Sequence, residues 1–203
     1  MVYENSPSIS APETQARIVI SGASGWLGCT IADQAARMHR SIALDIEGSP
    51  SKSQLVANLA SQDSVEKLLM QYHEHELKAD TFIHCAGLAH RPNETDSIKK
   101  AMWAVNDRGT ARALEFCERA GISKFLYVSA IAGYDWTKET PAKETDILNP
   151  KTEYAKSKLA GEERTLNAPI DGRAVRLATV FGSGDKANFL KLSFAGDYES
   201  SSF

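Results

Sequence analysis

Tyr154 and Lys158, four positions apart, are the side chains whose types and spacing best suit chemistry. In a helix this spacing places both side chains on one face, one turn apart. A free phenol has a pKa of about 10 and is a poor base at neutral pH, but a neighbouring ammonium group favours the phenolate and lowers that pKa. The pair could therefore move a proton on and off a hydroxyl group. Tyr and Lys at this spacing are also common on solvated helix faces, so the interpretation depends on its context.

A glycine-rich turn supplies this context. Gly22, Gly25 and Gly28 follow a short apolar run and open a segment with apolar residues at helical spacing. Small residues let the backbone turn tightly and approach a pyrophosphate, and the N-terminus of the following helix offers free N–H groups and the positive end of its dipole. The pattern indicates a dinucleotide site. Incidental glycines between a strand and a helix are the alternative.

Asp45 favours the dinucleotide interpretation, because it ends the next apolar run, 20 residues after Gly25. A carboxylate at this place can accept hydrogen bonds from both hydroxyls of an adenosine ribose, and it would repel a 2′-phosphate. Residues 46–48 contain no Arg or Lys that could hold such a phosphate. The sequence therefore predicts NAD rather than NADP, with Tyr154 moving a proton while a hydride passes to the nicotinamide. A solvated turn acid is the alternative for Asp45.

Strands and helices must alternate to bring these residues together. Apolar runs predict strands and helical periodicity predicts helices between them, with Ser61 as the cap of the second helix and Gly121 as the end of the third. This alternation predicts an α/β fold with a parallel sheet covered on both faces. Together with the glycine turn and the family resemblance given below, it predicts a doubly wound sheet of the NAD-binding Rossmann type in the order 3-2-1-4-5-6, with the ligand at the carboxyl ends of the strands. The predicted strands are residues 17–21, 41–45, 54–59, 80–85, 124–129 and 173–181, and the predicted helices are residues 26–38, 61–76, 95–120 with a break near 107–109, and 152–166.

Composition sets the class of protein. The chain has 203 residues, 42% of them hydrophobic, a net charge of -3, and no apolar run long enough to cross a membrane. We expect one folded domain without nucleic-acid or membrane partners, with a flexible lead at residues 1–16, the NAD-binding domain at 17–190 and a short tail at 191–203. Three separate cysteines and no signal-peptide pattern favour the cytoplasm, with the cysteines as buried small hydrophobes. His73 and His75 face different directions on a predicted helix, so we expect no metal site.

The sequence resembles the extended short-chain dehydrogenases, in particular the NAD-dependent epimerase/dehydratase family. Five pieces match that family in order, and the match covers about residues 17–190. Within the family, the segment 88–92 and the loop after the fifth strand look most like nucleotide-sugar 4-epimerases of the UDP-glucose type. The five pieces are the glycine turn at 22–28, Asp45, His-Cys-Ala-Gly at 84–87, Asn-Asp-Arg-Gly-Thr at 106–110, and the Tyr154 and Lys158 pair.

The resemblance implies a nucleotide-sugar substrate, an NAD cofactor and 4-epimerisation by transient oxidation, and it allows a homodimer. It assigns Tyr154 as the acid/base, Lys158 to the nicotinamide ribose and Asn106 as a brace of the active-site helix. Trp26 and Leu27 would offer backbone N–H groups to the pyrophosphate, and Asn58 and Leu59 would lie beside the adenine. A buried thiol at Cys85 and a helix cap at Asn106 are the alternatives there. The implied catalytic residues are Tyr154, Lys158 and Ser129, and the implied cofactor-binding residues are Gly22, Gly25, Trp26, Leu27, Gly28, Asp45, Asn58, Leu59, Cys85, Ala86, Gly87, Asn106, Tyr154 and Lys158.

Two departures from the family leave a second function open. The family usually has Ser or Thr where this chain has Ala130, and Ser129 falls one residue early, so its side chain would point to the other face of the strand unless the strand end is bulged. The family's smaller, substrate-gripping lobe is expected to be largely missing. A non-catalytic NAD-binding module, or a truncated pseudoenzyme, is therefore the alternative to an enzyme. Arg176 could meet a substrate phosphate or form an ion pair, and His90 and Arg91 could contact a diphosphate.

Overall fold

Six strands form one parallel sheet in the order β3-β2-β1-β4-β5-β6, as the sequence predicts. The computed structural model describes residues 17–38, 41–47, 55–89, 94–137, 141–182 and 184. The strand order reverses between β1 and β4, so the carboxyl ends of these two strands flank the point where ligands bind in such sheets. The strands are β1 Ile18–Ser21, β2 Ser41–Asp45, β3 Leu55–Val56, β4 Thr81–His84, β5 Lys124–Ala130 and β6 Asp171–Leu177.

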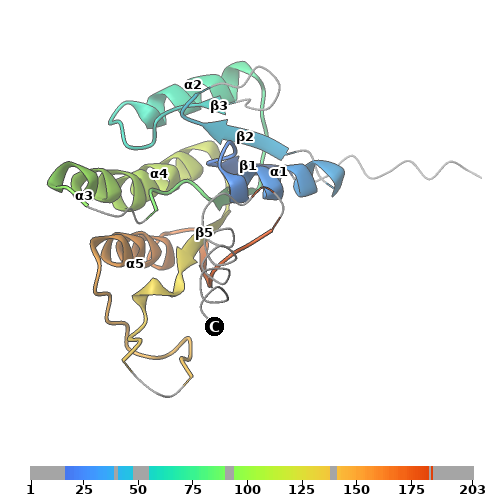
Figure 1. Cartoon of the computed structure of the whole chain (residues 1–203). Coiled ribbons are helices and arrows are strands. Elements are labelled where there is room, and N and C mark those ends of the chain that lie inside the picture. The colour runs from blue at the N-terminus through green and yellow to red at the C-terminus, as the bar shows by residue number, and fades with distance from the viewer. Residues whose placement is uncertain are drawn as a thin grey trace, which may run out of the picture.

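Helices cover both faces of the sheet. Three of them, α2, α4 and α5, lie side by side in one layer, whereas α1 packs against β1 and β2 on the other side (Figure 1). The helices are α1 Trp26–Met38, α2 Ser64–Glu74, α3 Asp96–Trp103, α4 Thr110–Ala120 and α5 Glu153–Leu166, with a π-helical segment η1 Ala104–Gly109 and a 3-10 turn η2 Ile131–Gly133. The alternation of strands and helices confirms the predicted α/β class.

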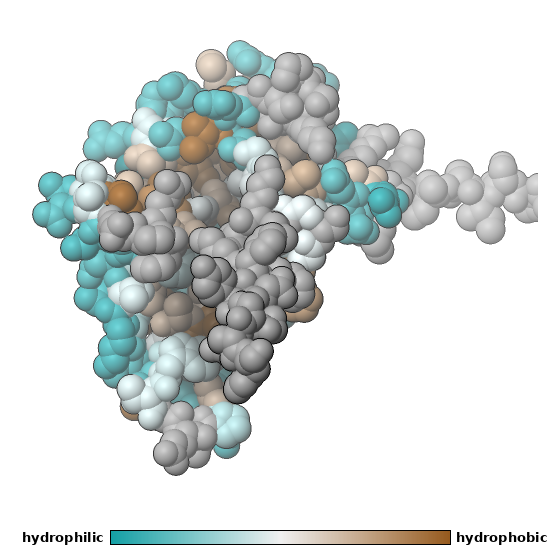
Figure 2. Space-filling view, viewed as in Figure 1, coloured by the Kyte–Doolittle hydropathy of each residue, from teal (hydrophilic) through white to brown (hydrophobic). Residues whose placement is uncertain are grey.

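The core lies between the sheet and the layer of α2, α4 and α5. Central strands of a parallel sheet are covered on both faces, so their residues are apolar without alternation. Helix α2 contributes the face predicted from its periodicity, since Val65, Leu68, Leu69 and Tyr72 are all buried. In Figure 2 the outline formed by the helices is mainly hydrophilic, and hydrophobic atoms gather toward the middle of the view.

The long third helix continues where the sequence predicts a break, but its hydrogen bonding changes there from α-helical to π-helical. Helix α3 passes into η1 and then into α4, so one extra residue per turn is inserted over 104–109. Gly121 ends α4 in the left-handed conformation, with φ 73°, as predicted. The inserted turn matters for the site, because it contains Asn106.

Some element boundaries differ from the sequence prediction. Helix α2 begins at Ser64, not near Ser61, because Asp63 stands at the N-cap and the Ser61 hydroxyl donates to the Asp63 carboxylate instead of capping the helix. Strand β6 spans Asp171–Leu177, so it begins and ends earlier in the sequence than the predicted strand at residues 173–181. The boundary predicted at residue 190 and the segments 1–16 and 191–203 lie outside the described residues.

All three cysteines of the chain are free, and they differ in burial. Cys117 is buried as predicted, but Cys29 and Cys85 are only partly buried, so the prediction of three buried cysteines is wrong for two of them. No helix in the described part of the chain is long and apolar enough to cross a membrane. The described ranges also contain no cluster of three or more His, Cys, Asp or Glu side chains that could hold a metal ion.

Candidate functional site

A cleft of about 270 Å³ opens at the carboxyl ends of β1, β2 and β4. Many of the residues predicted to hold the cofactor line this cleft. Trp26, Leu27 and Gly28 form the first turn of α1, and Asn106, Tyr154 and Lys158 belong to η1 and α5 beside it. The predicted residues in the lining are Gly22, Gly25, Asp45, Asn58, Leu59, Cys85, Ala86 and Gly87.

The glycine turn has no room for side chains at two of its positions. Gly22 has a φ of +69°, and a Cβ atom on it would lie 2.8 Å from the backbone N and Cα of Ala86. A Cβ atom on Gly28 would lie 2.8 Å from the carbonyl carbon of Gly22. The turn therefore packs directly on the segment after β4, and α1 begins beside the cleft. This arrangement fits the diphosphate of a dinucleotide, which binds at backbone N–H groups of a helix N-terminus.

The Asp45 carboxylate already accepts several hydrogen bonds within the protein, which the sequence does not predict. Its Oδ2 atom accepts hydrogen bonds from the Ser24 backbone N–H at 2.7 Å and from the Ser24 hydroxyl at 2.6 Å, and its Oδ1 atom accepts one from the Ile46 N–H at 2.7 Å. A carboxylate has about four acceptor positions, so little capacity is left for a ribose. A ribose hydroxyl would share Oδ1 or replace the Ser24 hydroxyl. Asp45 is therefore more than a solvated turn acid, because its contacts with Ser24 fix the glycine turn, and its role at a ribose stays a prediction.

Lys158 lies buried at the wall of the cleft. Its Nζ atom donates to the Val128 carbonyl at 2.6 Å and lies 4.2 Å from the centre of the Tyr127 ring. The same Nζ atom is 3.6 Å from the place of a Cβ atom on Gly87, which lines the cleft. Burial lowers the pKa of Lys158 to about 8, while its interactions with Cys85 and Glu162 act to raise it.

Tyr154 differs from the expectation in its ionisation. Burial raises the pKa of Tyr154, because desolvation penalises the phenolate. The sequence predicts that Lys158 lowers this pKa, but burial is the effect that governs it in this structure. The phenol is therefore protonated at neutral pH until a further positive charge reaches it.

Asn106 joins three elements of the site. Its Oδ1 atom accepts from the Leu88 N–H at 2.8 Å, and its Nδ2 atom donates to the Leu88 carbonyl and to the Ser157 hydroxyl, both at 3.0 Å. The Ser157 hydroxyl in turn donates to the Tyr154 carbonyl at 2.9 Å. Asn106 is fully buried within a continuous helical run, so the alternative of a helix cap is wrong. The amide instead ties the segment after β4 to α5.

Ser129 does not take the place of Ala130. The pairing of β5 with β6 continues without interruption through Ala130, which pairs with Leu177. Side chains therefore keep alternating along β5, and Ser129 lies buried on the same side as Tyr127. The bulge that would turn the Ser129 hydroxyl toward the position of Ala130 is not present. A catalytic role for Ser129 stays a prediction that this geometry does not favour.

Three other residues of the predicted motifs have clear places in the structure. His84 is a packing residue: it is fully buried, its Nδ1 lies 2.6 Å from the Ser21 hydroxyl, and burial lowers its pKa to about 3. Cys85 lines the cleft, and burial raises the pKa of its thiol to about 11. Arg176 forms an ion pair with the buried Glu162, with Nη2 and Oε1 2.6 Å apart. His90 and Arg91 lie outside the described residues.

Several residues of the site gave no signal in the sequence. The Arg112 guanidinium donates to the carbonyls of Leu59 and Ala60, at 3.0 and 3.1 Å, and so fixes the turn predicted to face the adenine. Ser24 and Tyr127 were missed as well. All of these act through contacts between residues far apart in sequence, which spacing does not reveal.

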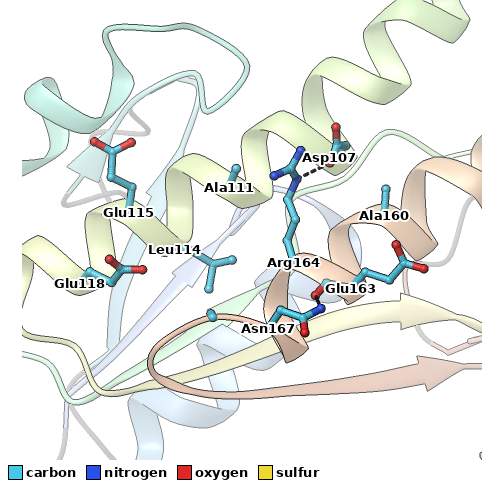
Figure 3. Close-up of a pocket in the computed structure, with 10 residues that line it drawn as sticks. Asp107, Ala111, Leu114, Glu115, Glu118, Ala160, Glu163, Arg164 and Asn167 are labelled. Atoms are coloured by element: carbon cyan, nitrogen blue, oxygen red, sulfur yellow. Dashed lines mark hydrogen bonds and ion pairs between the residues drawn. The ribbon is translucent and has the colours of Figure 1, made fainter.

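A second hollow, of about 510 Å³, lies between α4 and α5 and shares no residue with the cleft. Figure 3 shows carboxylates and small side chains along it, with the Arg164 guanidinium turned toward Asp107, its ion-pair partner. The other carboxylates on its wall are Glu115, Glu118 and Glu163. Nothing in this hollow resembles a nucleophile, a base with a partner or a phosphate site.

Comparison with known proteins gives a match over most of the chain. A family model described as the RmlD substrate binding domain matches residues 16–196. The dTDP-4-dehydrorhamnose reductase of Mycolicibacterium smegmatis is 30% identical over 177 residues, which are 86% of this chain and 49% of that protein. The chain spans about half the length of the curated relatives that it matches most extensively.

Solved structures are similar over most of the chain as well. A dTDP-4-dehydrorhamnose reductase of Clostridium acetobutylicum has a TM-score of 0.71 at 22% identity, covering 90% of this chain and 60% of that chain. A structure described as MoeE5 in complex with UDP-glucose and NAD has a TM-score of 0.69 at 25% identity, covering 86% of this chain and 58% of that chain. These likenesses agree with the doubly wound α/β fold.

Proposed function

Because the chain belongs to the RmlD substrate binding domain family, we propose that it binds a nicotinamide dinucleotide in the cleft and oxidises or reduces a nucleotide sugar. One observation carries this proposal. Lys158 reaches the cleft wall at Gly87, and Tyr154 stands one helical turn before it on the same face of α5. The proposed acid/base pair therefore meets the proposed dinucleotide site.

The residues present fit the dinucleotide. The N-terminus of α1 at Trp26 and Leu27 would hold the diphosphate, Asp45 the adenosine ribose, and Lys158 the nicotinamide ribose. Asn58 and Leu59 would lie beside the adenine in the turn fixed by Arg112. We propose NAD rather than NADP, because the Asp45 carboxylate would repel a 2′-phosphate. When bound, the nicotinamide supplies or accepts the hydride.

The chain's own residues would manage the proton that accompanies the hydride. In reduction of a sugar ketone, the protonated Tyr154 phenol gives its proton to the ketone oxygen, and in oxidation the phenolate takes the hydroxyl proton. The Lys158 ammonium supports the phenolate form electrostatically. Asn106 and Ser157 hold the start of α5 against the segment after β4, so that the phenol stays oriented.

Two finer activities follow from different observations. The relatives named dTDP-4-dehydrorhamnose reductase favour reduction of a 4-keto sugar attached to a nucleotide. The loop segments of the sequence favour 4-epimerisation of a UDP-sugar, as expected from the family resemblance. A reductase consumes one reduced coenzyme for each product, whereas an epimerase returns the hydride and consumes none, so net oxidation of the coenzyme separates them.

The test begins with the purified chain. Its NADH and NADPH affinities are measured by fluorescence titration. A dTDP-4-keto-6-deoxy sugar is then added with NADH, or UDP-galactose with NAD, while absorbance at the nicotinamide band and sugar products are followed. We expect saturable NADH binding and turnover of one of these sugars. Tyr154→Phe is the control: it should still bind NADH but turn over at least about 100-fold more slowly. Turnover that survives in Tyr154→Phe would exclude the proposed acid/base.

A non-catalytic NAD-binding module is the second candidate, and Ala130 favours it. A side-chain hydroxyl that hydrogen-bonds the reacting oxygen is missing at that position, and loss of such a donor slows enzymes by roughly 100-fold or more. The module predicts NADH binding without turnover of any sugar. Replacing Ala130 with serine then provides the discriminating variant, because an enzyme should become faster, whereas a module should stay inactive.

A further inference from the structure

The ammonium group of Lys158 has two described partners, and one of them is an aromatic ring. The Val128 carbonyl accepts one N–H at 2.6 Å, and the centre of the Tyr127 ring lies 4.2 Å from Nζ. Lys158 is 7% exposed, so little water can solvate its charge. The ring face is electron-rich and attracts a cation within about 6 Å, most strongly where water is excluded. Tyr127 is therefore placed to hold the charge of Lys158.

Tyr127 cannot move away from this position. Its side chain is fully buried, and its hydroxyl donates to the Asn106 carbonyl at 3.4 Å. On the other side, a Cβ atom on Gly161 would lie 2.5 Å from the same hydroxyl, so α5 touches the ring through a glycine. The ring is thus fixed between β5, η1 and α5, and it offers Lys158 a rigid surface.

Two other groups help to hold the charge of Lys158 besides the ring: the Val128 carbonyl, which accepts from Nζ, and the Glu162 carboxylate, which acts to raise the pKa of Lys158. At the end of β4, His84 is neutral, and Cys85, which follows the strand, keeps its thiol proton, because burial lowers the pKa of the first and raises that of the second. From α5, burial keeps Tyr154 protonated, since it raises the pKa of the phenol. The Glu162 carboxylate also lies on α5, but it is engaged at short range by Arg176.

We propose that Tyr127 is a positioning residue for Lys158: the face of its ring keeps the lysine in its ammonium form and aims it at the cleft wall beside Gly87. The function of this contact rests on the proposed dinucleotide site, in which Lys158 meets the nicotinamide ribose. A hydrophobic side chain of the same size would fill the space but would not stabilise the cation. The hydroxyl of Tyr127 is not needed for this effect, since only the ring faces Nζ.

Graded fluorination of the ring tests this inference without changing its shape. Tyr127→Phe keeps the ring, and increasingly fluorinated phenylalanines at position 127 withdraw electron density from its face at nearly constant volume. The ionisation of Lys158 is followed by NMR of lysine ¹³Cε, with the signal assigned by its loss in Lys158→Met. We expect Tyr127→Phe to titrate like the wild type, near pH 8, and each added fluorine to lower the pKa of Lys158, by roughly one unit in total.

The inference is overturned if the fluorinated proteins titrate like Tyr127→Phe, or if their lysine pKa rises. Tyr127→Met, which has no ring, provides a second comparison and should lower the lysine pKa as far as full fluorination does. NADH titration of the same proteins separates this result from the proposed function. If fluorination shifts the lysine pKa but the chain binds no dinucleotide, the proposed function is refuted and the positioning role stands. If the chain binds NADH but fluorination leaves the lysine pKa unchanged, the positioning role is refuted and the dinucleotide site stands.

Discussion

Replacing Gly161 with alanine should force α5 away from η1, although the change adds only one methyl group. A Cβ atom at this position would lie 2.5 Å from the Tyr127 hydroxyl and closer still to the Asn106 carbonyl oxygen. Both atoms are buried, and both belong to groups that other contacts hold in place. The helix must therefore shift, or the Tyr127 hydroxyl must leave its acceptor.

The magnitude follows from opposing contributions. Alanine favours a helix over glycine by about 1 kcal/mol. Overpacking of a buried contact costs about 1–3 kcal/mol, and loss of the hydroxyl hydrogen bond costs a further 0.5–1.5 kcal/mol, roughly. The free energy of unfolding is thus expected to fall by about 1–3 kcal/mol. Because α5 carries Lys158, the affinity for NADH should fall in the same variant.

Urea denaturation measures this change, and Gly133 provides the matched control. A Cβ atom on Gly133 would lie 3.8 Å from a Leu148 methyl carbon, which is ordinary contact, and Gly133 is not among the glycines with positive φ. Gly133→Ala should therefore leave the stability unchanged or raise it by up to about 1 kcal/mol. Equal stability of Gly161→Ala and Gly133→Ala would refute the packing of α5 against η1 described above.

Three further perturbations test single interactions. Asp45→Asn removes the charge that opposes a 2′-phosphate, so the NADPH affinity relative to that of NADH should rise roughly tenfold in fluorescence titrations; an unchanged ratio counts against the ribose site. Arg176→Met leaves the Glu162 carboxylate buried without its partner and should lower the free energy of unfolding by about 3–5 kcal/mol. Arg173→Met, at an exposed ion pair, should change it by less than about 1 kcal/mol. Similar urea midpoints for the two variants would contradict this prediction. Burial lowers the pKa of His84 to about 3, whereas an unfolded histidine ionises near 6.5, so the unfolded state binds the proton first as the pH falls. The free energy of unfolding should therefore decrease as the pH drops below about 6.5. An equally steep decrease in His84→Gln would exclude His84 as the source of this pH dependence.

Hydrophobic periodicity predicted the helices and strands well, because burial of one face makes apolar residues recur at regular spacing in the sequence. Helix α1 occupies the predicted residues 26–38, and β2 the predicted residues 41–45. The strand order followed from the glycine turn and the family resemblance together, since both place the ligand at the reversal of the sheet. The π-helical turn was predicted only as a break near residues 107–109.

The contacts that set the chemistry could not be predicted from spacing. Asp45 meets Ser24 across the carboxyl ends of β1 and β2, and Lys158 on α5 meets Tyr127 on β5. Each pair lies at least 20 residues apart, and no local pattern distinguishes one cross-element neighbour from another. The raised pKa of Tyr154 has the same origin, because desolvation depends on the packing around the phenol rather than on the lysine one turn away.

Calorimetric titration of the folded chain with NADH and NAD tests the central claim most directly. We predict binding of one dinucleotide per chain, and competition by ADP-ribose, which shares the diphosphate. Gly28→Ala should abolish the heat, because its Cβ atom would meet the Gly22 backbone beneath the diphosphate site. If neither the reduced nor the oxidised coenzyme releases or absorbs heat, with circular dichroism showing a folded protein, the cleft is not a dinucleotide site.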